Sequence, residues 1–115
     1  MEYLLMIYTS EDTKKATPPA EMGAILQAYG AYTDALHQAG VFHGGERLHP
    51  TANATSVCVR NGKSEVLNGQ FADTQEQLGG YYVIDVPDLD AAVQWAARCP
   101  SSASGAIEVR QIWTM

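Results

Sequence analysis

The sequence has few basic residues and few cysteines. Seven Lys and Arg residues stand against thirteen Asp and Glu residues, which gives a formal net charge of −6 at pH 7. No cluster of Lys or Arg is visible in the sequence, although a local basic site is not excluded. We therefore expect neither nucleic acid nor an anionic membrane as a partner. The two cysteines, Cys58 and Cys99, have no Cys or close His beside them, so we expect two buried thiols rather than metal ligands.

Long apolar runs and cofactor motifs are also absent. The segment Tyr3–Tyr8 is too short for a membrane span or a signal sequence, and we expect a cytoplasmic protein. The glycine-rich nucleotide motifs, HExxH, CxxC and GxSxG do not occur. The residues His43, Glu46, His49 and Asp73 match no metal-ligand spacing, so we predict no metal and no other cofactor.

Apolar periodicity predicts strands and helices within one domain of 115 residues. The expected strands are residues 2–9, 41–48, 54–60, 64–67, 81–86 and 106–113; the expected helices are 18–40, which Pro18-Pro19 starts, and 88–99; 10–17 and 49–53 are expected loops. Asn61-Gly62 predicts a hairpin turn. Gly44-Gly45 predicts a bulge or a close approach of two backbones.

The order of these elements predicts the fold class. A β-α-β unit, a hairpin and a β-α-β unit imply a ferredoxin-like α+β sandwich with an added β-hairpin and with both helices on one sheet face. The strand at residues 81–86 is rich in Tyr, Val and Ile, which predicts a central position. Because the other sheet face is also apolar, we expect a second copy to cover it.

Two groups of polar residues are candidates for a site. Asp73 and Glu76 are three residues apart, so on a helical turn they would share a face and form an acid/base pair. The same spacing also fits a capping box, which needs no chemistry. His43 precedes Gly44-Gly45-Glu46, and an imidazole beside a carboxylate suits proton transfer near neutral pH. The alternative is a strand histidine bonded to a backbone carbonyl, and both interpretations stay open.

Most of the chain resembles a known family. The matching segments are NGQFADTQEQLGGYYVIDV, DLDAAVQWAARCP, MEYLLMIY, AGVFHGGERLHP and GAIEVR. They resemble the DGPF family within the YCII-related superfamily, which implies a single domain over residues 1–115 and a dimeric α+β barrel. The DGPF signature itself is replaced here by Asn68-Gly69-Gln70-Phe71.

The resemblance leaves two functional hypotheses, because the family has no general activity. The first is cofactor-free acid/base chemistry on a small organic molecule in a cleft between helix and sheet. Its expected catalytic residues are His43, Glu46, Asp73 and Glu76, and its expected ligand-binding residues are Tyr8, Phe71, Tyr82 and His49. The second is a non-catalytic module that binds a small ligand or a regulatory partner, linked by the resemblance to extracytoplasmic-function sigma factor systems.

Overall fold

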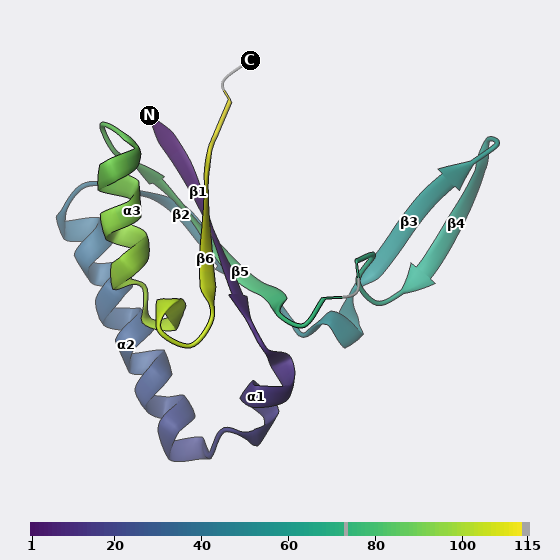
Figure 1. Cartoon of the computed structure of the whole chain (residues 1–115), viewed down its shortest axis with the longest axis horizontal. Helices are drawn as coiled ribbons and strands as arrows, with labels where there is room; N and C mark the ends of the chain where they lie inside the picture. The colour runs from purple at the N-terminus through teal and green to yellow at the C-terminus, as the bar shows by residue number, and fades with distance from the viewer. Residues whose placement is uncertain (73, 114–115) are drawn as a thin grey trace.

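The protein is built on a four-stranded antiparallel sheet, seen in a computed structural model that describes residues 1–72 and 74–113 (Figure 1). The strands are β1 (Glu2–Thr9), β2 (Phe42–Arg47), β5 (Gln77–Asp85) and β6 (Ala106–Gln111), in the order β2-β5-β1-β6. Every neighbouring pair is antiparallel. This order is that of a ferredoxin-like α+β fold, so the predicted fold class is confirmed, and β5 lies in the interior of the sheet as expected.

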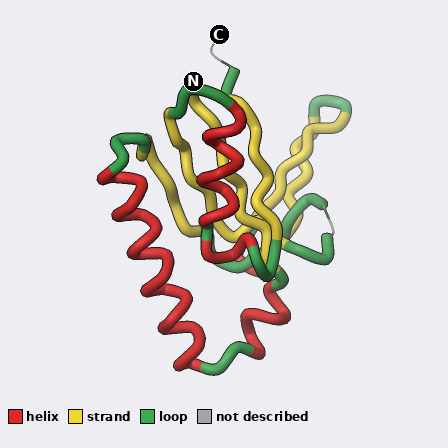
Figure 2. The backbone as a smooth tube through the Cα atoms, turned by 60° about the vertical axis from the view of Figure 1, so that its left-hand side comes forward, coloured by secondary structure: helices red, strands yellow, loops and turns green. Residues whose placement is uncertain are grey.

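Two helices cover one face of this sheet, as Figures 1 and 2 show. They are α2 (Pro19–Gln38) and α3 (Leu89–Arg98), and both were predicted within a few residues. Pro18 caps α2, Gly40 follows its end with a φ of 72°, and Asp88 caps α3 by accepting a hydrogen bond from the Ala91 amide. The caps that the sequence predicts therefore set the helix ends.

The hydrophobic core lies between the two helices and the sheet. Its fully buried members are Leu5 on β1, Leu36 on α2 and Ile84 on β5. Only Tyr32 and Leu36 are buried on α2, because its N-terminal turns extend past the strands toward α1 (Figure 2). The apolar stripe of α2, the apolar residues at three- and four-residue spacing from which the helix was predicted, therefore lies outside this core at Met22, Ile25 and Leu26.

The segment at residues 10–17 was expected to be a loop, and this prediction was wrong. Helix α1 (Glu11–Ala16) forms there, and the Ser10 hydroxyl accepts a hydrogen bond from the Thr13 amide at its first turn. Acidic residues in its first turn and lysines in its last turn suit the helix dipole. The helix has no buried residue, so the apolar periodicity that reveals other helices is missing here.

The predicted hairpin projects away from the main sheet (Figure 1). It pairs β3 (Thr55–Arg60) with β4 (Lys63–Asn68), and Asn61 and Gly62 take φ values of 51° and 75° in the turn. Its valines are exposed: Val57, Val59 and Val66 by 60%, 60% and 62%. Cys58 lies on this ribbon and is only partly buried, so the expectation that both thiols are buried holds for Cys99 alone.

Glycines allow β2 and β5 to approach closely. The register of the pair shifts between Phe42 and Gly44, which is the predicted irregularity. A Cβ atom added at Gly45 would lie 2.8 Å from Cδ1 of Tyr82 and 2.9 Å from the Tyr81 carbonyl oxygen. A Cβ atom added at Gly44 would meet no atom within 4 Å. The structure therefore has space for a Cβ atom at Gly44 but not at Gly45.

We predict that G45A lowers the free energy of unfolding by about 1–3 kcal/mol, because the new methyl group overpacks the contact with Tyr82 and its neighbour. G44A is the matched control, since the same change on the same strand meets open space. Its effect should stay within about 1 kcal/mol. Urea unfolding of both variants measures the difference, and equal losses would contradict the role given to Gly45.

Among the described residues, no helix combines the length and the apolar character needed to cross a membrane.

Candidate functional site

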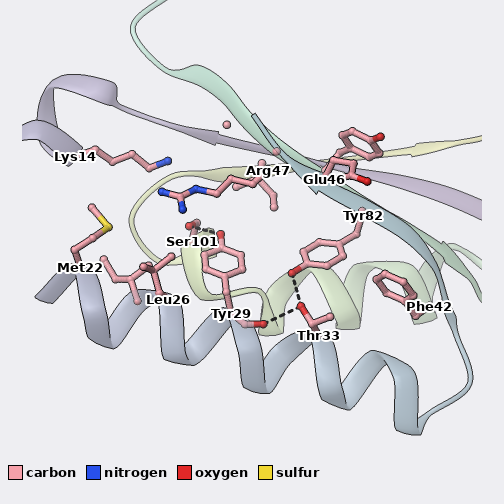
Figure 3. A pocket seen from close by; sticks show the side chains of 16 residues that line it. Lys14, Met22, Leu26, Tyr29, Thr33, Phe42, Glu46, Arg47, Tyr82 and Ser101 are labelled. Atoms are coloured by element: carbon pink, nitrogen blue, oxygen red, sulfur yellow. Dashed lines mark hydrogen bonds between the residues drawn. The ribbon is translucent and has the colours of Figure 1, made fainter. Parts of the chain in front are cut away.

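A cavity of about 240 Å³ lies on the helix-covered face, between α2 and the strands β2 and β5 (Figure 3). The volume is below the roughly 300–1,000 Å³ typical of sites for drug-sized ligands, so the cavity suits a compact molecule. Apolar side chains from α2 form much of its wall, namely Met22, Ile25, Leu26 and Tyr29. Ile25 and Leu26 remain 40% and 46% exposed, so the core does not cover them.

Three glycines of the sheet leave space for this cavity. Gly45, Gly79 and Gly80 all line it, and β5 carries its irregularity beside the last two. A Cβ atom added at Gly79 would lie 3.3 Å from the Lys14 ammonium nitrogen. Without these three glycines, side chains would occupy part of the volume under the first turns of α2.

Hydroxyl groups form a connected network at one side of the cavity. The Tyr29 hydroxyl donates to Oγ of Ser101, and the Thr33 hydroxyl donates to the Tyr29 carbonyl at 2.9 Å. Because this bond uses the proton of Thr33, the Tyr82 hydroxyl is the donor in its 2.7 Å bond with Oγ1 of Thr33. Figure 3 shows the three bonds in one row along α2. The network fixes the ring positions of Tyr29 and Tyr82, and all four of its residues line the cavity.

Burial changes the acidity of these phenols. It raises the pKa of Tyr29 strongly, although the hydrogen bond to Ser101 opposes the shift. Burial also raises the pKa of Tyr82, against the hydrogen bond from Tyr82 to Thr33, which lowers it. Both phenols therefore stay protonated at neutral pH and serve as hydrogen-bonding groups, not as general bases.

Two cations reach the cavity from opposite sides. Lys14 extends from α1 and Arg47 from the end of β2, and in Figure 3 the ammonium and the guanidinium point toward one another. The position of α1 is fixed by Glu11, whose two carboxylate oxygens accept from the amide and the hydroxyl of Thr51, each at 2.8 Å. The Glu11 amide donates to the Gln77 side chain at 2.9 Å. These bonds hold Lys14 next to β5.

Of the eight residues predicted for the site, Glu46 and Tyr82 line the cavity. Tyr82 contributes its ring and hydroxyl. Glu46 lies opposite Tyr81 in the register, whereas Arg47 lies opposite Gly80 on the helix-covered face. Strand alternation places the Glu46 carboxylate on the uncovered face of the sheet, and in Figure 3 it points away from the Arg47 guanidinium. The backbone of Glu46 therefore lines the cavity, and its carboxylate does not enter it.

The predicted residue His43 lies at the edge of the sheet and does not line the cavity. Its Nδ1 is 2.6 Å from Oε2 of Glu2, and its Nε2 is 3.8 Å from Oδ2 of Asp85. The N-terminal ammonium of Met1 bonds Asp85 at 2.8 Å and lowers the pKa of that carboxyl. His43 therefore has carboxylate partners, as the sequence suggested, but they are Glu2 and Asp85 instead of Glu46.

The remaining predicted residues are dispersed. Tyr8 lies opposite Leu78 on the uncovered sheet face, His49 is exposed in the loop after β2, and Phe71 is 72% exposed. Glu76 is partly buried just before β5, in a segment, residues 74–76, that is not helical. Asp73 lies outside the described residues. Among the described residues, the structure thus does not bring His43, Glu46 and Glu76 together in the cavity.

Several cavity residues were not predicted from the sequence: Lys14, Arg47, Tyr29, Thr33 and Ser101. Tyr29 was recognised as part of the apolar stripe of α2, but only as a packing residue. Lys14 and Arg47 are 33 positions apart, and Lys14 belongs to the helix that the sequence did not reveal. A Lys/Arg pair that meets only through tertiary structure leaves no local sequence signal.

Comparison with known proteins identifies the family. The model of the YCII-related domain matches residues 1–115. The chain belongs to this family. An uncharacterised protein of Rhizobium meliloti (strain 1021) is 31% identical over 114 residues, which are 97% of this chain and 92% of that protein. The resemblance to the YCII-related superfamily is therefore confirmed over the whole chain.

A solved structure shows the same fold. It is 5-chloro-2-hydroxyhydroquinone dehydrochlorinase from Burkholderia phenoliruptrix AC1100, in complex with 2,5-dihydroxybenzoquinone. The match has a TM-score of 0.50 and 12% sequence identity, and it covers 98% of this chain and 94% of that chain. At this identity the likeness establishes the architecture of this YCII-related protein.

We predict that Tyr29 and Tyr82 resist ionisation in the folded protein. Their folded pKa values lie above the unfolded value of about 10, so their stabilising contribution is complete below pH 10. It is lost as the pH rises from there through the folded values. The free energy of unfolding should fall with pH above about 10, and less steeply in Y29F. Phenolate absorbance and urea unfolding test this, and equal slopes in the two proteins would contradict it.

Proposed function

We propose that this YCII-related protein binds a compact, mainly apolar organic molecule, such as one carrying a single ring, in the cavity under α2. The observation that carries the proposal is the cavity itself, in which an apolar wall faces a row of fixed hydroxyl groups. Apolar walls supply affinity, and a few placed polar groups fix the orientation of a ligand. A hydroxyl group on the ring could donate to the oxygen of Tyr29 or Ser101, and the Ser101 hydroxyl, whose proton the network does not use, could donate to a ring carbonyl.

The structural relative supports this class of ligand at the level of the fold. The dehydrochlorinase is named for a substituted hydroquinone and was solved with a substituted benzoquinone, and both are single rings with oxygen substituents. A ring of that size is compatible with a cavity of about 240 Å³. Because sequence identity is only 12%, the reaction of that enzyme is not part of the proposal.

Binding, rather than acid/base catalysis, is the function that the cavity favours. The Glu46 carboxylate faces the other side of the sheet, His43 lies outside the cavity, and burial keeps Tyr29 and Tyr82 protonated. Acid/base chemistry by His43, Glu46, Asp73 and Glu76 stays a prediction. A regulatory module linked to sigma-factor systems would use the same binding step, and assays for conversion of a bound ligand distinguish a binder from an enzyme.

We predict that the neutral ring compounds benzamide and hydroquinone shift the NMR signals of the backbone amides that line the cavity, in a saturable manner. The reporters are Gly45, Gly79 and Gly80. L26W should abolish these shifts, because an indole ring on this cavity residue occupies the space beside α2. Q27W is the control, since Gln27 is exposed on the same helix and does not line the cavity. Absence of saturable shifts in the native protein, or persistence in L26W, would count against the proposal.

We also propose that the protein works as a homodimer whose sheets face each other. The uncovered face of the main sheet carries the partly buried residues Leu4, Met6, Tyr8, Tyr81 and Val83. An isolated two-stranded ribbon is marginally stable at best in water, and here it exposes three valines. A second copy would cover both surfaces, because a two-fold axis supplies an identical apolar face.

We predict that light scattering at micromolar concentration gives the mass of two chains for the native protein. M6E should give the mass of one chain, because Met6 lies between Tyr81 and Glu108 on the uncovered face and a second carboxylate beside Glu108 would be buried in the interface next to a like charge. Q27E adds the same charge on the exposed side of α2 and should remain dimeric. A native protein with the mass of one chain would exclude this dimer.

A further inference from the structure

Two positive charges, those of Lys14 and Arg47, lie at the mouth of the cavity (Figure 3). Within residues 1–72 and 74–113, neither Lys14 nor Arg47 forms an ion pair. The two groups nevertheless point toward one another across the opening (Figure 3). Like charges that converge raise the electrostatic energy of the empty site, and an anion placed between them lowers it.

Both cations are positioned by structure. Lys14 follows Glu11 by three residues, about one helical turn, so the bonds from Glu11 to Thr51 and Gln77 fix the backbone from which Lys14 extends. Its ammonium lies against Gly79, where an added Cβ atom would come within 3.3 Å. Arg47 is the last residue of β2 and lies opposite Gly80, whose missing side chain leaves room for the guanidinium stem on the helix-covered face.

We propose that Lys14 and Arg47 recognise the carboxylate of a small organic acid, whose apolar body occupies the cavity. This inference rests on the proposed binding function and adds the charge of the ligand. The planar guanidinium can donate two parallel hydrogen bonds to a carboxylate, and the ammonium adds a point charge from the opposite side. The apolar wall formed by Met22, Ile25 and Leu26 then faces the uncharged part of the molecule.

A matched pair of probes tests the proposal. Benzoate and benzamide have nearly the same size and shape, and they differ in charge. We expect the native protein to bind benzoate at least about 10-fold more tightly than benzamide at low ionic strength, since hydrogen bonds to charged groups are the stronger ones. Titration followed by NMR at the amides of Gly79 and Gly80 measures both dissociation constants.

Charge-removing variants assign the effect to the two cations. R47Q and K14Q should each weaken benzoate binding by about 10-fold and change benzamide binding by less than about 2-fold. K15Q removes the positive charge of Lys15, which is the neighbour of Lys14 on α1 and does not line the cavity. This variant should leave both affinities unchanged. Arg47 and Lys14 are exposed, so unchanged melting temperatures should confirm that both variants fold.

The outcomes separate this inference from the proposed function. Equal binding of benzoate and benzamide, with no effect of R47Q or K14Q, would overturn the anion site and leave the cavity as a binding site for neutral rings. Failure of both probes to bind the native protein would overturn both. A loss of benzoate affinity in K15Q as large as in K14Q would also overturn the proposal, because it would reduce the effect to general surface charge.

Discussion

The cavity of this protein depends on the absence of side chains where β2 and β5 meet. Gly45 and Gly80 cannot carry even a methyl group without a clash, since an added Cβ atom would lie within 3 Å of a neighbouring backbone oxygen. The strands therefore approach closely, and no side chain projects from Gly45 or Gly80 on the helix-covered face. Because interiors otherwise pack to crystal-like density, a hollow of this size requires such a local lack of volume.

The length of α2 lets the same helix form one wall of this hollow. Its C-terminal half packs on the sheet through Tyr32 and Leu36, while its N-terminal half passes over the glycines with Leu26 and its neighbours still partly exposed. The hydroxyl network around Thr33 lies at the boundary between the two halves. One helix thus anchors the core and forms the wall of the cavity, which places a rigid element beside the ligand.

Most of the fold could be predicted from the sequence because its signals are local. A continuous apolar run locates β1, Pro18-Pro19 and Asp88 locate helix starts, and Asn61-Gly62 locates the hairpin turn. Helix α1 could not be predicted in this way, because it buries no residue and is stabilised by Ser10 and by the contacts of Glu11 with distant segments. Its stability comes from tertiary structure, which periodicity does not report.

The candidate site could be predicted only in part, for a related reason. Gly44-Gly45 and Tyr82 were recognised, since a glycine pair inside a predicted strand is a local pattern, whereas Gly79 and Gly80 were not assigned to the site. The direction of the Glu46 side chain was not, because the register of β2 against β5 places that carboxylate on the uncovered face. A register shift of one residue exchanges the two faces of a strand. Because the register is irregular at Phe42–Gly44, counting residues along β2 does not show which face carries the Glu46 side chain.

The negative charge of the chain and a site for an anion are compatible. The net charge of −6 is a sum over the whole sequence, and at physiological salt the field of exposed charges is largely screened beyond about 8 Å. A ligand of the proposed kind would contact Lys14 and Arg47, which line the cavity, while most acidic side chains would act on it only through screened solvent. What the net charge governs is the approach of the ligand from a distance. Which charge the ligand carries is decided at contact, by two side chains that the fold brings together.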